Sequence, residues 1–90
     1  MYTIKYTNQF KKSYQLMLKR GLDISLLDDV IAQLKDGKEL DPKYKDHALT
    51  GIYKGFRECH IKPDWLLIYF IENNTLTLTM VNTGSHSDLF

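Results

Sequence analysis

Histidine is the side chain in this sequence best suited to proton transfer, and the chain has three: His47, His60 and His86. Imidazole titrates near neutral pH, so one ring can accept a proton while another donates one. Each histidine taken singly is typical of a surface or packing position. Together with Asp64 and Arg57, they supply the groups needed for acid–base cleavage of a phosphodiester. An arginine such as Arg57 can hold a phosphate in a bidentate manner and stabilise its developing charge.

A metal centre is the competing interpretation of three histidines and a carboxylate. The spacings match no compact ligand motif, and alternation along a strand directs Cys59 to the face opposite His60. We therefore expect no metal and no cofactor. On the face that it shares with Arg57 and Ile61, Cys59 is expected to be a buried thiol that packs as a small hydrophobic group rather than a nucleophile.

Two aromatic residues could contact a base. Trp65 begins an apolar strand, which is compatible either with a core position or with a stacking platform for single-stranded RNA. Phe90 is the last residue, and its ring could pack, stack on a base or fray with the terminus. The sequence leaves these alternatives open for both residues.

Hydrophobic periodicity predicts the first elements that position these groups. Alternating apolar residues over residues 2–6 predict a short strand. Two apolar stripes at helical spacing then predict a helical hairpin joined around Gly21. Thr7 or Asn8 is expected to cap the start of the first helix, which should end at Gly21. A capping box of Ser25 with Asp28 is expected at the start of the second helix, which should end at Gly37.

The second half of the chain changes period. A long loop is expected over residues 38–50, and such loops are commonly functional. Three strands rich in aromatic and β-branched residues follow at residues 56–62, 65–71 and 75–81, with turns at Pro63-Asp64 and Asn73-Asn74. The prediction is an α+β fold of order β-α-α-β-β-β, in which two N-terminal helices pack on a small, mainly antiparallel sheet. One domain is expected over residues 1–90.

Composition excludes several classes of protein. The 90 residues carry a net charge of +1 and are 43% hydrophobic, which is typical of a globular chain and not of a disordered one. No apolar run approaches the ~20 residues that a membrane helix needs. A single cysteine excludes an internal disulfide framework and favours a reducing cytoplasm.

Three segments of the chain resemble the YafQ family of bacterial toxins, in the RelE/ParE superfamily of type II toxin–antitoxin systems. They are DHALTG (residues 46–51), KGFRECHIKPDWLLIY (residues 54–69) and TGSHSDLF (residues 83–90). The β-α-α-β-β-β order agrees with the fold of that superfamily. The resemblance implies an mRNA endoribonuclease that cuts translated messages on the ribosome without a metal, by attack of the 2′-OH on the adjacent phosphorus.

The resemblance also implies roles for individual residues. The catalytic residues of the family fall on His47, His60, Asp64 and His86, and its flanking aromatic residues on Trp65 and Phe90. Arg57 matches a basic strand position assigned to phosphate contact. Asp64 or His60 is expected as the base and His86 as the acid, while His47 and Arg57 give electrostatic support.

The resemblance further implies a cognate antitoxin that holds the toxin inactive and links it to operator DNA. Because the net charge is only +1, we expect weak affinity for free RNA, with the ribosome supplying the docking energy. Two alternatives stay open. One is a ParE-like toxin that inhibits DNA gyrase without catalysis, and the other is a nucleic-acid-binding module that does not cleave.

Overall fold

The computed structural model describes residues 2–72 and 77–90. In chain order the elements are β1 (Thr3–Tyr6), α1 (Asn8–Lys19), α2 (Ile24–Lys35), η1 (Pro42–Tyr44), β2 (His47–Ala48), η2 (Gly51–Tyr53), β3 (Arg57–Lys62), β4 (Trp65–Glu72), β5 (Thr77–Gly84) and α3 (His86–Leu89). The elements η1 and η2 are single turns of 3-10 helix. The expected α+β fold is confirmed, and β2 and α3 are additions to it. The expected Asn73-Asn74 turn lies outside the described residues.

Side-chain caps set the start of each helix in the hairpin. The Thr7 hydroxyl accepts a hydrogen bond of 3.0 Å from the backbone N–H of Phe10, as expected. At the second helix the expected Ser25 cap is wrong, because the carboxylate of Asp23 accepts the N–H of Ser25 and caps the helix itself. A carboxylate at this position also interacts favourably with the helix dipole. Gly21 follows α1 with φ 79°, a conformation that favours glycine.

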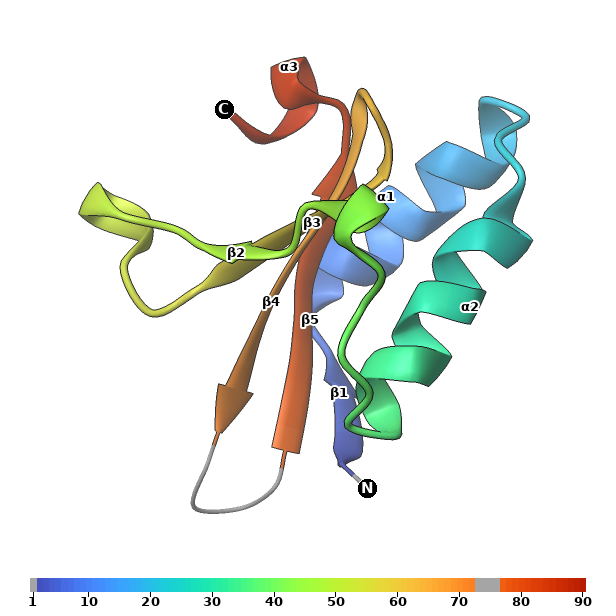
Figure 1. The fold of residues 1–90 in the computed structure, drawn as a ribbon. Coiled ribbons are helices and arrows are strands. Elements are labelled where there is room, and N and C mark those ends of the chain that lie inside the picture. The colour runs from blue at the N-terminus through green and yellow to red at the C-terminus, as the bar shows by residue number, and fades with distance from the viewer. Residues whose placement is uncertain (1, 73–76) are drawn as a thin grey trace.

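The five strands form one sheet in the order β1-β5-β4-β3-β2 (Figure 1). All neighbouring pairs are antiparallel except β1 and β5, which run parallel, so the sheet is mainly antiparallel as expected. The last strand continues to Gly84 instead of ending at Val81. This extension places α3, and His86 with it, directly at the end of β5.

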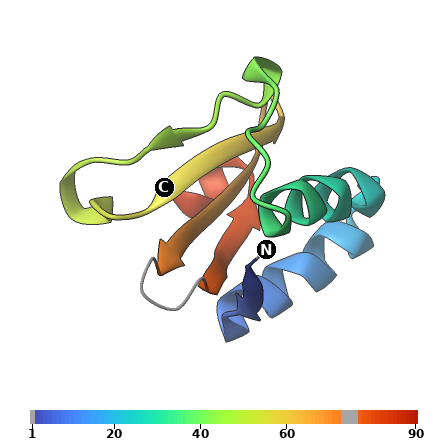
Figure 2. The same cartoon turned by 60° about the horizontal axis from the view of Figure 1, so that its bottom comes forward.

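Both long helices cover one face of the sheet (Figure 2). The core between them contains Phe10, Met17, Leu27 and Val30 from the helices, and Cys59, Leu67, Tyr69 and Met80 from the strands. The expected burial of Cys59 is confirmed, because its side chain is 0% exposed. Burial raises the pKa of this thiol to about 12, so it stays protonated at neutral pH and is no candidate nucleophile.

The expected loop over residues 38–50 is more ordered than predicted. It contains η1 and the short strand β2, which pairs His47 with Glu58 and Ala48 with Arg57. A strand of two residues is too short to show alternation, so periodicity could not reveal it. Among the described residues, no helix is both long and apolar enough to cross a membrane.

Candidate active site

The three histidines lie together, although 13 and 26 positions separate them in the sequence. His47 comes from β2, His60 from β3 and His86 from the first position of α3. The ring centroids of His47 and His60 are 6.3 Å apart, and those of His60 and His86 are 5.8 Å apart. The outer two rings are about half exposed, whereas the side chain of His60 is 18% exposed. The three rings therefore lie close enough together to act on one group of a substrate.

Glu58 is a member of this cluster that the sequence analysis missed. Its carboxylate Oε1 lies 3.4 Å from His60 Nε2 and 3.9 Å from His47 Nε2. The residue is only 6% exposed. A buried carboxylate requires partners that supply protons or positive charge, and here those partners are two imidazoles. Glu58 and His60 are two positions apart on one strand, so alternation alone could have placed them on the same face.

The tautomer of His47 follows from its hydrogen bond to the backbone. Its Nδ1 lies 2.6 Å from the carbonyl oxygen of Lys45. A carbonyl only accepts, so Nδ1 must carry the hydrogen. Nε2 is therefore the atom that faces Glu58, and its protonation determines the charge that His47 presents to the cluster.

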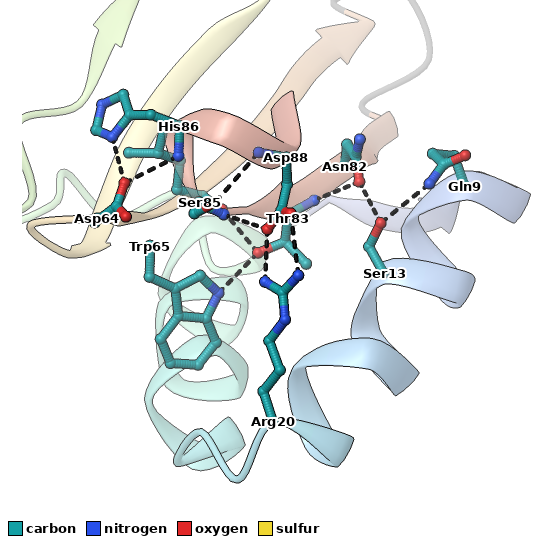
Figure 3. Close-up of polar contacts among 11 residues, drawn as sticks. Gln9, Ser13, Arg20, Asp64, Trp65, Asn82, Thr83, Ser85, His86 and Asp88 are labelled. Carbon is teal, nitrogen blue, oxygen red and sulfur yellow. Dashed lines mark hydrogen bonds and ion pairs between the residues drawn. The ribbon is translucent and has the colours of Figure 1, made fainter. Parts of the chain in front are cut away.

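His86 is held by the carboxylate of Asp64 (Figure 3). Asp64 Oδ1 lies 2.6 Å from His86 Nδ1 and accepts the backbone N–H of His86 at 3.0 Å. These two hydrogen bonds hold the pKa of Asp64 below its usual range, and the one from the backbone N–H has the larger effect. An ionised Asp64 fixes the hydrogen of His86 on Nδ1, so Nε2 is free to exchange a proton with substrate.

The turn that carries His86 is stabilised by its own cap. The Ser85 hydroxyl accepts the N–H of Asp88 at 3.2 Å, and the Asp88 carboxylate accepts the N–H of Ser85 at 2.8 Å. This is a capping box, in which the two side chains satisfy each other's backbone donors. The expected last strand ends at residue 81, which would leave His86 beyond the sheet, whereas in the structure His86 lies on an ordered helical turn directly after β5.

Arg57 does not join the histidines. It precedes Glu58 on β3, so its side chain lies on the opposite face of the sheet. There Arg57 Nη2 donates to Asp46 Oδ2 at 3.1 Å, and the Tyr69 hydroxyl donates to Asp46 Oδ1 at 2.6 Å. The hydrogen bond to Asp46 raises the pKa of Arg57. The structure therefore does not bring Arg57 to the histidines, and its expected phosphate contact stays a prediction.

The two aromatic candidates differ in exposure. Trp65 is 4% exposed, and its indole N–H donates to the Thr83 hydroxyl at 3.0 Å (Figure 3). Trp65 therefore occupies a core position rather than a stacking platform, because a base cannot stack on a covered ring. Phe90 is 56% exposed and meets the edge of Tyr53 with ring centroids 5.3 Å apart. The Phe90 ring is therefore held in place by Tyr53 and is still accessible to a ligand.

Glu58, His60 and His86 could also bind a metal ion. Each offers one ligand atom, and these atoms all lie within 4.8 Å of one another. Two imidazoles and one carboxylate form a donor set suited to zinc or copper. The expectation that the spacings contain no metal motif came from positions in the sequence, whereas this triad is assembled by the fold.

The chain is similar in sequence to known bacterial toxins. The model of the YafQ family, described as a bacterial toxin of type II toxin–antitoxin systems, matches residues 2–90. A protein of Escherichia coli strain K12 named mRNA interferase toxin YafQ is 38% identical over 88 residues, or 97% of this chain and 94% of that protein.

Solved structures extend the similarity to the whole chain. A metal-bound toxin from Helicobacter pylori is 48% identical, with a TM-score of 0.93 and coverage of 100% of both chains. The toxin in the DinJ-YafQ complex of E. coli is 36% identical, with a TM-score of 0.90 and coverage of 100% of this chain and 99% of that chain. The histidine cluster thus lies on a fold that these toxins share, and the chain belongs to the YafQ family of bacterial toxins of type II toxin–antitoxin systems.

Proposed function

We propose that this chain is an mRNA endoribonuclease that cuts translated messages on the ribosome, in the cytoplasm, until a cognate antitoxin neutralises it. The observation that carries the proposal is the placement of His47, His60 and His86 around the buried carboxylate of Glu58. The E. coli relative that is named mRNA interferase toxin YafQ supports this activity. The DinJ-YafQ complex supports a protein antitoxin as the partner. Contact with operator DNA is proposed only through that antitoxin.

The proposed reaction is an internal transfer of the phosphoryl group. The 2′ oxygen of the RNA forms a bond to the adjacent phosphorus, and the bond from phosphorus to the 5′ oxygen of the next nucleotide breaks. A base takes the proton of the 2′-OH, and an acid gives a proton to the leaving 5′ oxygen. The products are a 2′,3′-cyclic phosphate and a free 5′-OH, and the proton balance closes within the site.

Glu58 and His60 together form the best candidate for the base. Their side chains are 3.4 Å apart, so the Glu58 carboxylate can orient the His60 ring and stabilise the imidazolium that forms when His60 takes the proton of the 2′-OH. This assignment replaces Asp64 as a base, because Asp64 already accepts two hydrogen bonds from His86. Asp64 is a positioning residue for His86 in this scheme.

His86 is proposed as the acid and His47 as the stabilising cation. The hydrogen bond of His86 Nδ1 to Asp64 orients the ring, so that Nε2 in its protonated form can donate to the leaving oxygen. His47 lies on the other side of His60, where a charged ring offsets the negative charge that develops on the phosphate. The exposed ring of Phe90 is the proposed stacking surface for a base.

A programmed-ribosome assay tests the proposal. A 5′-labelled message is incubated on ribosomes with the wild-type protein or His86→Ala, and free RNA is run alongside. The chelator EDTA is added only to the free-RNA arm, because ribosomes need magnesium. Ser87→Ala, which alters the neighbouring exposed residue of α3, is the matched control. We expect cutting that depends on ribosomes, persists in Ser87→Ala and is lost in His86→Ala.

Three results count against parts of the proposal. A folded wild-type protein that does not cut on ribosomes excludes the nuclease, and binding to DNA gyrase then becomes the function to test. Cutting that survives His86→Ala removes His86 from the acid role. Tight binding of the wild type to free RNA at physiological salt contradicts the expected dependence on the ribosome.

A further inference from the structure

A cleft of about 350 Å³ adjoins the histidine cluster. It lies between α2, the η1 turn and the end of β3, and His60 forms part of its wall. Leu26, Tyr44 and Pro63 contribute its apolar surface, and Lys43, Lys45 and Lys62 contribute its charge. We call it the lysine cleft. Its volume is within the range of sites that hold one small ligand, about 300–1,000 Å³.

The lysine cleft gathers positive charge that is not neutralised locally. Lys43, Lys45 and Lys62 are exposed, and none of them forms an ion pair with any residue in the described parts of the chain. The one carboxylate in its lining, Asp29, accepts a hydrogen bond from Gln33 within α2. The whole chain has a net charge of only +1, so this grouping is local and favours an anionic ligand.

Two irregularities of the backbone occur among the residues that line the cleft. Lys45 has φ 50°, the only positive φ outside glycine in the part of the chain that the structure describes. The pairing of β3 with β4 shifts between His60 and Lys62, which is a β-bulge. Strained residues and bulges are found preferentially at functional sites, where they aim side chains. The strained residue is also joined to the cluster, because the Lys45 carbonyl accepts the Nδ1–H of His47.

We propose that the lysine cleft binds the nucleotide one position beyond the two that flank the cleaved phosphodiester bond. The base would lie against Tyr44, Leu26 and Pro63, and the lysines would contact the flanking phosphates. An RNA strand is continuous, so the nucleotide that follows the pair at the reacting phosphate must lie on a surface that borders the site. His60 belongs to both surfaces. This inference rests on the proposed function and names a subsite of the same substrate.

Binding of short, uncleavable RNA tests the subsite without ribosomes. The probes are the 2′-O-methyl oligonucleotides ApA and ApApA, which lack the attacking hydroxyl, titrated into the whole protein by NMR. A nucleotide in a stacking subsite typically raises affinity by about 5- to 150-fold. We expect the third nucleotide to raise the affinity of the wild type within this range. In the triple variant Lys43→Ala, Lys45→Ala, Lys62→Ala this gain should fall below about twofold.

The matched control removes the same charge from the other side of the molecule. Lys5, Lys11 and Lys12 lie on β1 and α1, and β1 is at the sheet edge far from β3. Their triple alanine variant should keep the full gain from the third nucleotide. In the cleft variant the slope of log affinity against log salt should also fall by about 0.7 for each phosphate that the lysines no longer neutralise. Unchanged affinity for ApA shows that the cleft variant is folded.

The outcomes separate the subsite from the proposed function. No gain from the third nucleotide in the wild type, or an equal gain in the cleft variant, overturns the subsite. Equal oligonucleotide binding together with weaker binding of the cleft variant to ribosomes also overturns it, because the lysines then contact ribosomal RNA. A gain that depends on the lysines, in a protein that does not cut on ribosomes, supports the cleft and overturns the nuclease.

Discussion

Arg20 and Asp88 form a bidentate ion pair across 68 positions of sequence, with Nη1 to Oδ2 at 2.7 Å and Nη2 to Oδ1 at 3.1 Å (Figure 3). Arg20 caps the end of α1, and Asp88 belongs to the helical turn that carries His86. The same carboxylate accepts the N–H of Ser85. The helical hairpin is thereby joined directly to the element that positions the proposed acid.

Removal of Arg20 should therefore impair catalysis at a distance. In Arg20→Ala the turn of α3 is no longer tied to α1, and His86 is less well placed for proton transfer. A displacement of about 1 Å can lower a catalytic rate by about 100-fold, so we expect a decrease of about 10- to 100-fold in the rate of cutting on ribosomes. The KM for the programmed ribosome should change little.

Lys19→Ala is the control for this prediction, because it removes the same charge from the preceding residue of α1. Its rate should equal that of the wild type. Arg20→Lys keeps the charge without the bidentate geometry and should recover only part of the rate. An Arg20→Ala variant with an unchanged rate contradicts a positioning role for the pair.

The ion pair should also make stability depend on pH. The hydrogen bond from Arg20, with that from the Ser85 N–H, holds the pKa of Asp88 below its usual range. The unfolded chain therefore takes up a proton more readily than the folded one as pH falls, and the stabilisation is lost on acidification. It should be complete above about pH 5 and should decline below the ordinary aspartate pKa of about 3.9.

Thermal unfolding of the wild type and of Asp88→Asn between pH 2 and 8 measures this effect. The wild type should have the higher Tm at neutral pH, and the two values should converge as pH falls below about 4. Asp36→Asn, at the end of α2, alters another exposed carboxylate and serves as the control. A difference between wild type and Asp88→Asn that is constant down to pH 2 contradicts the assignment.

A second anchor locates His47. The hydroxyl of Tyr69, a residue that is 1% exposed, donates to Asp46 Oδ1 at 2.6 Å, and Asp46 directly precedes β2. Tyr69→Phe removes this hydrogen bond and leaves the ring in the core. We expect a decrease of about 1–2 kcal/mol in the free energy of unfolding, measured with urea. The cutting rate should fall several-fold, because β2 then holds His47 less firmly beside Glu58.

Tyr14→Phe is the matched control for that hydroxyl. The Tyr14 hydroxyl also donates to an aspartate, Asp28, at 3.0 Å, but it does so on the exposed surface of the helical hairpin. Its removal should lower stability less and should leave the cutting rate unchanged. Equal decreases of activity in both variants would attribute the effect to general destabilisation.

The sequence predicted the elements of this fold where a local pattern exists. Alternation and helical stripes identified both long helices and the meander, because each buries one face along many residues. The parallel pairing of β1 with β5 joins distant segments and leaves no local signal. The two-residue β2 is likewise too short for a periodic pattern.

The residues of the candidate site were likewise predictable only in part. The chemistry of imidazole singled out His47, His60 and His86, and the fold brings them together. Arg57 was included by residue type, although alternation already placed it on the face opposite His60. Glu58 was omitted because an acidic residue in a strand is usually solvated, and only its burial in the folded chain reveals its partners.

Zinc should inhibit this protein. Glu58, His60 and His86 can each give one ligand atom to a metal, and these are the groups whose lone pairs and protons the proposed reaction uses. We expect saturating Zn²⁺ to abolish cutting and a zinc chelator to restore it.

Zinc titrated into the protein alone should bind at least about tenfold more weakly to His60→Ala. His47→Ala, which changes a histidine outside the triad, should bind zinc with nearly wild-type affinity. Stimulation of cutting by zinc contradicts this prediction and the acid–base roles assigned to His60 and His86.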